Sequence, residues 1–375
     1  MRARLERVRV PRADEARERA LAVTLAAYAA REPLPVGGRR GRWVVVVLAA
    51  LALGLAVVSP PGRAVVDQVR EVVGVERSAP ALFALPSGRI LATSADGVWV
   101  VEHDGKKRLL PGSREASWSP FGRFVVTARR NELAALEPDG DVRWTLARPD
   151  VRDARWTGSA TDTRIAYVDR TGIRVVAGDG TGDRLLAPAE QGPVAWRPGA
   201  GHVLAYVSAS ELRVQDADTG RVLLRANRGI DSPVRAIDWS TDGRRLLVLD
   251  ARALRVFGAR GRLVRRDDPP AGARNVDAAF QPGTHRLLVA RVHRGQSTVF
   301  DLAGGRTLFN GTGVFDGITF SPDGRWLAIE WRTADQWVFV RADAPRTIRA
   351  VSGIATQFRG TPRIEGWCCP QEAER

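Results

Sequence analysis

The chain repeats one pattern, an aromatic residue followed by a tight turn and an apolar run, at intervals of about 40 residues. The clearest copy is FSPDGRWLAIEW, which begins at Phe320. Other copies begin at Trp118, Trp156, Trp196, Trp239 and Phe280, and a weaker one begins at Leu82. A regular spacing over most of a chain predicts that one structural unit is built several times.

The residues of the Phe320 copy fit a hairpin. Ser321 suits the first position of a type I turn, Pro322 fixes φ at the second, and Gly324 accepts the left-handed conformation that follows. This place in the turn makes Asp323 a corner residue rather than a catalytic acid. The apolar run after the turn lacks the alternation that marks a half-exposed strand. We therefore expect each hairpin to be covered on both faces.

A second strand pair with its own tight turn follows half a period later, and seven such pairs occur. One is GVWVVEHDGKKRLL from Gly97, and another is STVFDLAGGRTLF from Ser297. Two hairpins give each unit four strands, which is the make-up of one β-propeller blade. The sequence thus predicts an all-β fold, a propeller of about seven four-stranded antiparallel blades within residues 80–375.

The aromatic-Ser-Pro-Asp-Gly-Arg corner resembles the repeat of TolB-type propellers, most closely at 320–329 and 118–126. The period is also similar to that of WD repeats, although no Trp-Asp dipeptide occurs in the chain. The resemblance implies a propeller fold and no particular activity. The segment Trp367-Cys368-Cys369-Pro370 echoes the Trp-Ser-Pro corner. We expect it to supply a strand to the first blade and so to close the ring.

An uncharged apolar run, WVVVVLAALALGLAVVS, covers residues 43–59 and ends at Pro60-Pro61. As a helix it would reach about 25 Å, at the short end for a membrane span. It predicts a single transmembrane helix, with a long-leadered signal peptide as the alternative. Residues 1–42 hold eleven arginines against five acidic residues. The positive-inside rule therefore predicts a cytoplasmic N-terminus and an extracytoplasmic propeller at the cell membrane.

Two shorter segments flank this run. Within the cytoplasmic residues 1–42, a helix is predicted over about 13–31, with Leu21, Leu25 and Tyr28 on one narrow apolar face. The helix either lies on the inner leaflet or docks a cytoplasmic protein. Residues 60–79 are expected to form a stalk or a juxtamembrane helix.

The formal net charge of the chain is +15. The surplus is spread along the chain, and no basic stripe alternates with aromatic residues. We therefore expect no nucleic-acid partner. Attraction to the anionic lipid bilayer or to an acidic envelope polymer suits this charge better.

Motifs of catalysis are missing from the sequence. It contains no Gly-x-Ser-x-Gly nucleophile elbow and no Gly-x-x-x-x-Gly-Lys-Ser/Thr loop. The four histidines, His103, His202, His285 and His293, have no ligand spacing with one another. GDGTGD at 178–183 looks like a phosphate loop but separates two strands, so we interpret it as a hairpin turn. The sequence predicts no cofactor, no metal and no catalytic residue.

Acidic residues lie three positions before the aromatic residue in three of the units. They are Glu115, Asp153 and Asp277. Because these positions fall on the predicted innermost strands, we expect the three side chains to line the central channel. They would either give the channel ordinary polarity or contribute to a binding site.

Cys368 and Cys369 are the two cysteines of the chain, and they are adjacent. Outside the membrane they could form a disulfide with each other, link another chain, or stay as buried thiols. The sequence leaves these three states open.

Two classes of function fit these observations. The first is a membrane-anchored, non-catalytic module whose propeller loops bind a protein or a cell-envelope polymer, with transmission to a cytoplasmic partner. The second is a propeller enzyme, lactonase-like or glycan-acting, whose site is assembled in the central channel from several blades. We favour the first, because four scattered histidines supply a catalytic channel poorly.

Overall fold

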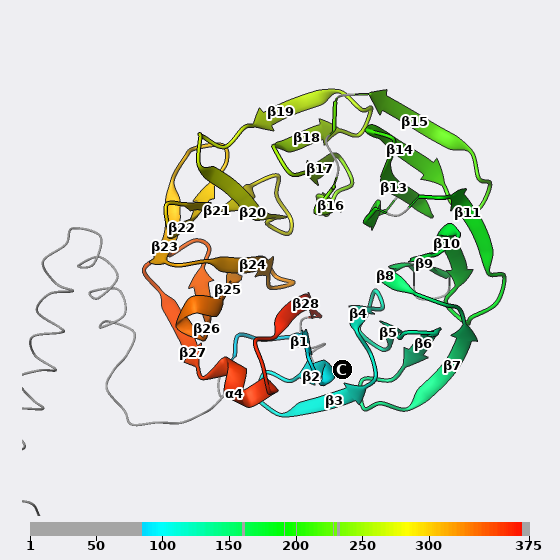
Figure 1. Ribbon diagram of the computed structural model, residues 1–375, viewed down its shortest axis with the longest axis horizontal. Helices are drawn as coiled ribbons and strands as arrows, with labels where there is room; N and C mark the ends of the chain where they lie inside the picture. Colours follow the sequence, from blue (N-terminus) through cyan, green and yellow to red (C-terminus); the bar gives the residue numbers. More distant parts are fainter. Residues whose placement is uncertain are drawn as a thin grey trace, which may run out of the picture. The chain divides into compact units, whose positions relative to one another are not determined.

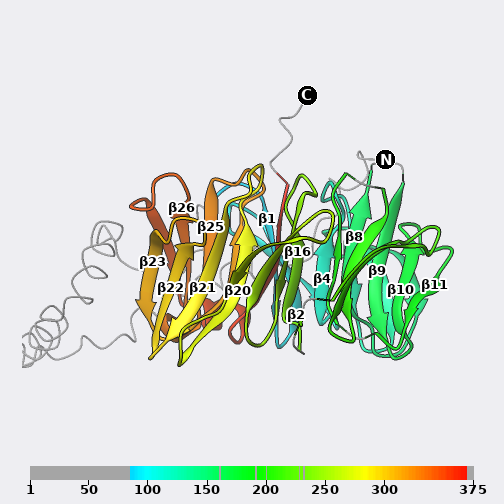
Figure 2. The same ribbon diagram turned by 90° about the horizontal axis from the view of Figure 1, so that it is seen from above.

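A computed structural model describes residues 85–159, 162–190, 192–199, 201–227, 229–230 and 233–369. In this part of the chain, seven four-stranded sheets stand around a common axis (Figure 1), and all their strand pairs are antiparallel. The predicted all-β fold with seven blades is confirmed. Seen from the side, the sheets lie next to one another around the ring (Figure 2).

The blades are numbered in chain order, and each is given with its innermost strand first. Blade 1 contains β28 (Arg363–Cys368), β1 (Arg89–Ser94), β2 (Gly97–Val101) and β3 (Lys107–Pro111). Blade 2 contains β4 (Glu115–Trp118), β5 (Val125–Ala128), β6 (Glu132–Leu136) and β7 (Val142–Ala147). Blade 3 contains β8 (Arg152–Gly158), β9 (Thr163–Asp169), β10 (Gly172–Ala177) and β11 (Arg184–Pro188). Blade 4 contains β12 (Val194–Trp196), β13 (Val203–Ser208), β14 (Glu211–Asp216) and β15 (Val222–Asn227).

The remaining blades follow the same plan. Blade 5 contains β16 (Ala236–Trp239), β17 (Arg245–Leu249), β18 (Leu254–Gly258) and β19 (Leu263–Asp267). Blade 6 contains β20 (Ala273–Phe280), β21 (Leu287–His293), β22 (Gln296–Asp301) and β23 (Thr307–Thr312). Blade 7 contains β24 (Phe315–Phe320), β25 (Trp326–Trp331), β26 (Gln336–Arg341) and β27 (Ile348–Ser352). Two short helices, η2 (Arg332–Ala334) and α4 (Ile354–Phe358), belong to the connections of blade 7.

The ring closes through β28. This strand follows all the others in the chain, yet it pairs with β1, with Ile90 opposite Trp367 and Leu91 opposite Gly366. The predicted closure by the segment around Trp367 is confirmed. Blade 1 is therefore built from both ends of the propeller sequence, and it leaves no gap between blades 1 and 7.

The Phe320 copy forms the predicted corner between β24 and β25. The amide of Gly324, whose φ is 68°, donates to the Ser321 carbonyl at 2.8 Å. The Ser321 hydroxyl donates to Asp323 Oδ1 at 2.6 Å, and the Arg325 amide donates to the same oxygen at 3.0 Å. Asp323 is thus a turn residue, as predicted.

Apolar side chains of neighbouring blades pack into shared clusters. One cluster joins Leu288 and Val299 of blade 6 with Phe320, Leu327 and Ile329 of blade 7. Leu327 and Ile329 are fully buried. Burying one such side chain contributes about 1.5–3 kcal/mol relative to leaving it exposed. The strand after the corner is therefore covered on both faces, as its sequence predicts.

The predicted cytoplasmic segment 1–42, the transmembrane helix 43–59 and the stalk 60–79 lie outside the described residues. Among the residues that are described, no helix has both the length and the apolar character of a membrane span.

Candidate functional site

The three acidic residues predicted to line the channel lie on innermost strands, Glu115 on β4, Asp153 on β8 and Asp277 on β20. Each carboxylate accepts a hydrogen bond from a main-chain amide of the next blade. The bonds are Asp153 N to Glu115 Oε2 at 2.5 Å, Val194 N to Asp153 Oδ2 at 2.9 Å and Ile318 N to Asp277 Oδ2 at 2.9 Å. These carboxylates therefore join successive blades near the axis. A hydrogen bond to a charged group contributes about 1.5–3 kcal/mol.

Local irregularities of β8 and β20 redirect the side chains of Asp153 and Asp277. The pairing of β8 with β9 shifts register between Arg152 and Arg155, and that of β20 with β21 shifts between Asn275 and Asp277. Such a bulge bends the strand and redirects a side chain. Asp153 has a φ of 51°, a left-handed conformation that Asp tolerates better than most residues. Asp153 and Asp277 consequently depart from the alternation of a flat strand, whereas Glu115 lies in the regular ladder of β4 with β5.

Arg155 supplies a positive charge to the same region. Its Nη2 lies 2.9 Å from Asp153 Oδ1. Burial lowers the pKa of Arg155, but the carboxylates of Asp153, Glu365 and Glu115 outweigh this, so the pKa is raised overall. Arg155 is therefore a permanent cation that balances acids from blades 1 to 3. The sequence pattern did not single it out.

Glu330 lies on β25, the second strand of blade 7, and like the acids on the innermost strands it accepts a main-chain amide of the next blade. Its side chain is 5% exposed, and it accepts the main-chain amide of Ile364 in β28. Gly317 of β24 makes this possible, because a Cβ atom there would lie 2.7 Å from Glu330 Oε1. Burial raises the pKa of Glu330 to about 8, and the nearby Asp277 adds to the effect. Glu330 is the one charged residue within the apolar run WLAIEW, and this isolation could have identified it from the sequence.

Asp238 of β16 is the second strongly perturbed acid. Its side chain is exposed at the inner strand, yet the ring surrounds it, and this desolvation raises its pKa to about 7. The solvent exposure means that its effect on stability is smaller than that of the buried Glu330. Asp238 directly precedes Trp239, so a search three positions before the aromatic residue misses it.

Within the described residues, no three histidine, cysteine or acidic side chains lie close enough together to hold a metal ion. His285 Nε2 lies 2.7 Å from Asp242 Oδ2, and His202 Nδ1 lies 2.5 Å from Asp218 Oδ2. Both histidines thus take part in contacts at blade turns.

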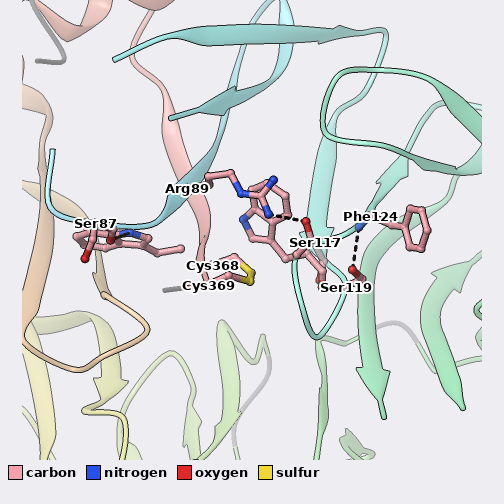
Figure 3. Close-up of a disulfide and its surroundings, with 10 residues drawn as sticks. Ser87, Arg89, Ser117, Ser119, Phe124, Cys368 and Cys369 are labelled. Atoms are coloured by element: carbon pink, nitrogen blue, oxygen red, sulfur yellow. Dashed lines mark hydrogen bonds between the residues drawn. A yellow bond between two sulfur atoms is a disulfide. The ribbon is translucent and has the colours of Figure 1, made fainter. Parts of the chain in front are cut away.

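Cys368 and Cys369 are joined to each other in a disulfide at the end of β28. Figure 3 shows this disulfide between Arg89 and the corner that begins at Ser119. A Cβ atom on Gly122 would lie 2.6 Å from Cys369 Sγ, and Arg89 Nη2 donates to the Gly122 carbonyl at 2.6 Å. The disulfide therefore packs against the corner of blade 2, beside the strand that closes the ring.

Two cavities meet at this corner. The larger, of about 1500 Å³, is lined by Arg89, Trp118, Phe121, Trp367 and the disulfide, among others. The smaller, of about 820 Å³, lies between blades 2 and 3 and is lined by Phe121, Phe124, Trp144 and Trp156, among others. Ser119, Pro120, Phe121 and Arg123 line both cavities, so the corner of blade 2 forms the ridge between them. No pattern in the sequence indicated this surface.

No protein-family model and no curated protein matches the sequence. Among solved structures, the C-terminal WD40 domain of Sif2 is similar over 77% of this chain and 85% of its own, with 14% identity and a TM-score of 0.53. Hydrazine synthase from Kuenenia stuttgartiensis is similar over 62% and 78%, with 16% identity and a TM-score of 0.50. A chain of the mitotic checkpoint complex is similar over 63% and 75%, with 16% identity and a TM-score of 0.50. At these identities the similarities show the fold alone, a propeller like those of WD40 domains.

Proposed function

We propose that this chain is a membrane-anchored, extracytoplasmic propeller with TolB-type repeats that binds a protein or a cell-envelope polymer through its loops and performs no chemistry. One observation carries the proposal. The axial carboxyl groups of Glu115, Asp153, Asp277 and Glu330 accept hydrogen bonds from main-chain amides of neighbouring blades. Their role is to hold the ring together. The WD40-like fold supports protein interaction in general.

The anchor is part of the proposal. The uncharged run 43–59 supports a single membrane span, and the arginine excess of residues 1–42 supports a cytoplasmic N-terminus. The face of Leu21, Leu25 and Tyr28 would then transmit binding at the propeller to a cytoplasmic protein.

Cell fractionation tests the anchor. The full chain should sediment with membranes, resist extraction at alkaline pH and dissolve in detergent. Recovery of a soluble, processed propeller that lacks residues 1–59 would contradict the anchor.

Crosslinking in intact cells, followed by pull-down through a tag on the full chain, tests the binding function. A partner that is captured reproducibly, and again by the purified chain, supports it. Absence of any saturable ligand among envelope proteins and polymers would argue against it.

A propeller enzyme, lactonase-like or glycan-acting, is the second candidate. It is favoured by the raised pKa of Asp238, about 7, at an exposed position on an innermost strand, which suits general acid–base catalysis at neutral pH. Hydrolysis of a lactone and glycoside panel by the full chain, and its loss in a folded Asp238→Asn variant, would replace the first proposal with this one.

A further inference from the structure

Phe121 departs from the pattern of the matching corners. In blades 5 and 7 the position holds Asp242 and Asp323, and each carboxylate accepts a serine hydroxyl at 2.6 Å and an arginine amide at 3.0 Å. Phe121 can make neither bond, and its side chain is 54% exposed. The corner keeps its turn all the same, because Gly122 N donates to the Ser119 carbonyl at 2.8 Å. The turn therefore does not require the phenyl ring.

The position of Phe121 also separates it from other exposed apolar residues. In the described residues, the other large exposed apolar side chains all lie on outermost strands: Val142 on β7, Leu185 on β11, Leu223 on β15 and Val264 on β19. Phe121 instead stands on the ridge between the two cavities. An exposed aromatic residue between two hollows is typical of an interaction surface.

Two arginines, Arg123 and Arg143, line the smaller cavity. The guanidinium of Arg123 lies 5.9 Å from the Phe124 ring, and that of Arg143 lies 5.3 Å from it. Arg123 is exposed and forms no ion pair with any described residue. Arg143 Nε lies 3.4 Å from Glu137 Oε1, and an exposed ion pair of this kind contributes little to stability. Among the described residues that line this cavity, Asp179 is the one acid. The charge of the rim therefore favours an anionic ligand.

Resting on the proposed binding function, we propose that the surface formed by Phe121, Arg123, Phe124, Arg143, Trp144 and Trp156, the Phe121 surface, binds an acidic segment of a partner protein. An aliphatic or aromatic side chain of that segment enters the cavity of about 820 Å³. Its carboxylates meet Arg123 and Arg143, since arginine forms strong, charge-assisted hydrogen bonds with carboxylates. Aromatic residues and arginine are the residue types enriched where protein interfaces concentrate their affinity.

The test uses the purified full chain and a displayed library of random twelve-residue peptides. We expect the selected peptides to contain Asp or Glu together with one Leu, Phe or Trp. Their affinity for Phe121→Asp and for Arg123→Glu should fall at least tenfold, and affinity for the wild type should weaken as salt is raised. Val264→Asp changes an apolar residue of similar exposure on β19, and it should bind as the wild type does. Thermal unfolding of each variant shows whether it remains folded.

Three results would overturn the inference. The first is that the selected peptides bind the Phe121→Asp variant with the same affinity as the wild type. The second is that they contain no acidic residues, and the third is that the library yields no binding peptide. A set of soluble glycans, tested in parallel, allows a fourth contradicting result. If a glycan binds and its binding depends on Phe121, the surface is a carbohydrate site. Peptides that bind elsewhere refute the Phe121 surface and leave the binding function standing. Failure of that function shows separately, in the crosslinking experiment.

Discussion

Blades 2 and 7 each place one carboxyl group where it accepts a main-chain amide of the next blade, but they take it from different strands. In blade 2 the acid is Glu115 of the innermost strand, which faces Ala128 across the ladder. In blade 7 it is Glu330 of the second strand, which reaches past Gly317 to Ile364. The bond between blades is therefore common to both, whereas the position of the acid in the repeat is not.

The corners of the two blades differ in the opposite way. Both keep the same turn, yet blade 7 has Asp323 where blade 2 has Phe121. In blade 7 the side chain strengthens the corner, whereas in blade 2 it projects between two cavities. The turn thus tolerates Phe in place of Asp, and the replacement loses the two hydrogen bonds that the Asp side chain accepts.

The largest effect is expected where the two blades are alike. Leu327 and Val125 hold equivalent positions after the corner, and both are fully buried. Leu327→Asp and Val125→Asp would each bury an unpaired charge, which costs more than a typical domain's stability of about 5–15 kcal/mol can absorb. We expect both variants to unfold or aggregate, as measured by circular dichroism and soluble yield. Leu327→Met is the control, and a folded Leu327→Asp variant would contradict tight packing between blades.

The next largest effect is a pH dependence of stability that comes from Glu330 of blade 7. The pKa of Glu330 is raised from 4.5 to about 8, so the folded state holds a proton that the unfolded state has lost between these values. Stability from this residue is therefore full below about pH 4.5 and falls as the pH rises toward 8, by a few kcal/mol. Glu330→Gln should remove this part of the slope in urea unfolding measured from pH 5 to 8.5. An identical slope in the variant would show that Glu330 is charged in the folded protein.

A smaller effect concerns the corner serines. The hydroxyls of Ser119 and Ser321 each accept an amide at 2.9 Å, from Phe124 and Trp326. Replacing either by alanine should cost about 1–3 kcal/mol. Ser321→Ala should cost more, because it also loses the bond to Asp323. Chemical denaturation of both variants measures the difference, and equal losses would mean that Asp323 adds nothing to its corner.

The smallest effect comes from exchanging the corner residues. Asp323→Phe should lower stability by about 1 kcal/mol, because two hydrogen bonds at a partly exposed site are lost. Phe121→Asp should leave stability unchanged or raise it by a similar amount, since it restores the pattern of blades 5 and 7. Thermal midpoints of the two variants measure this. A marked loss of stability in Phe121→Asp would show that the ring supports the fold.

Most of the architecture was predictable, because each blade needs its own aromatic residue, turn and apolar strand, and these recur with a visible period. The echo of the corner at Trp367 even indicated how the ring closes. The acids that join the blades were only partly predictable. Asp153 depends on a bulge, and Glu330 depends on the space left by Gly317 in another strand. Such relations form only when the sheet is built. Phe121, by contrast, could have been found by comparing the corners with one another.

Closure by β28 has a consequence for the order of folding. During synthesis, the partner of β1 is the last strand of the ring to leave the ribosome. Until then blade 1 lacks its innermost strand, and the inner edge of β1 is open to pairing with other chains. A contact between such distant segments also forms slowly, because the loop that must close is long. The inner edge of β1 therefore stays unpaired until blades 2 to 7 and then β28 have been synthesised.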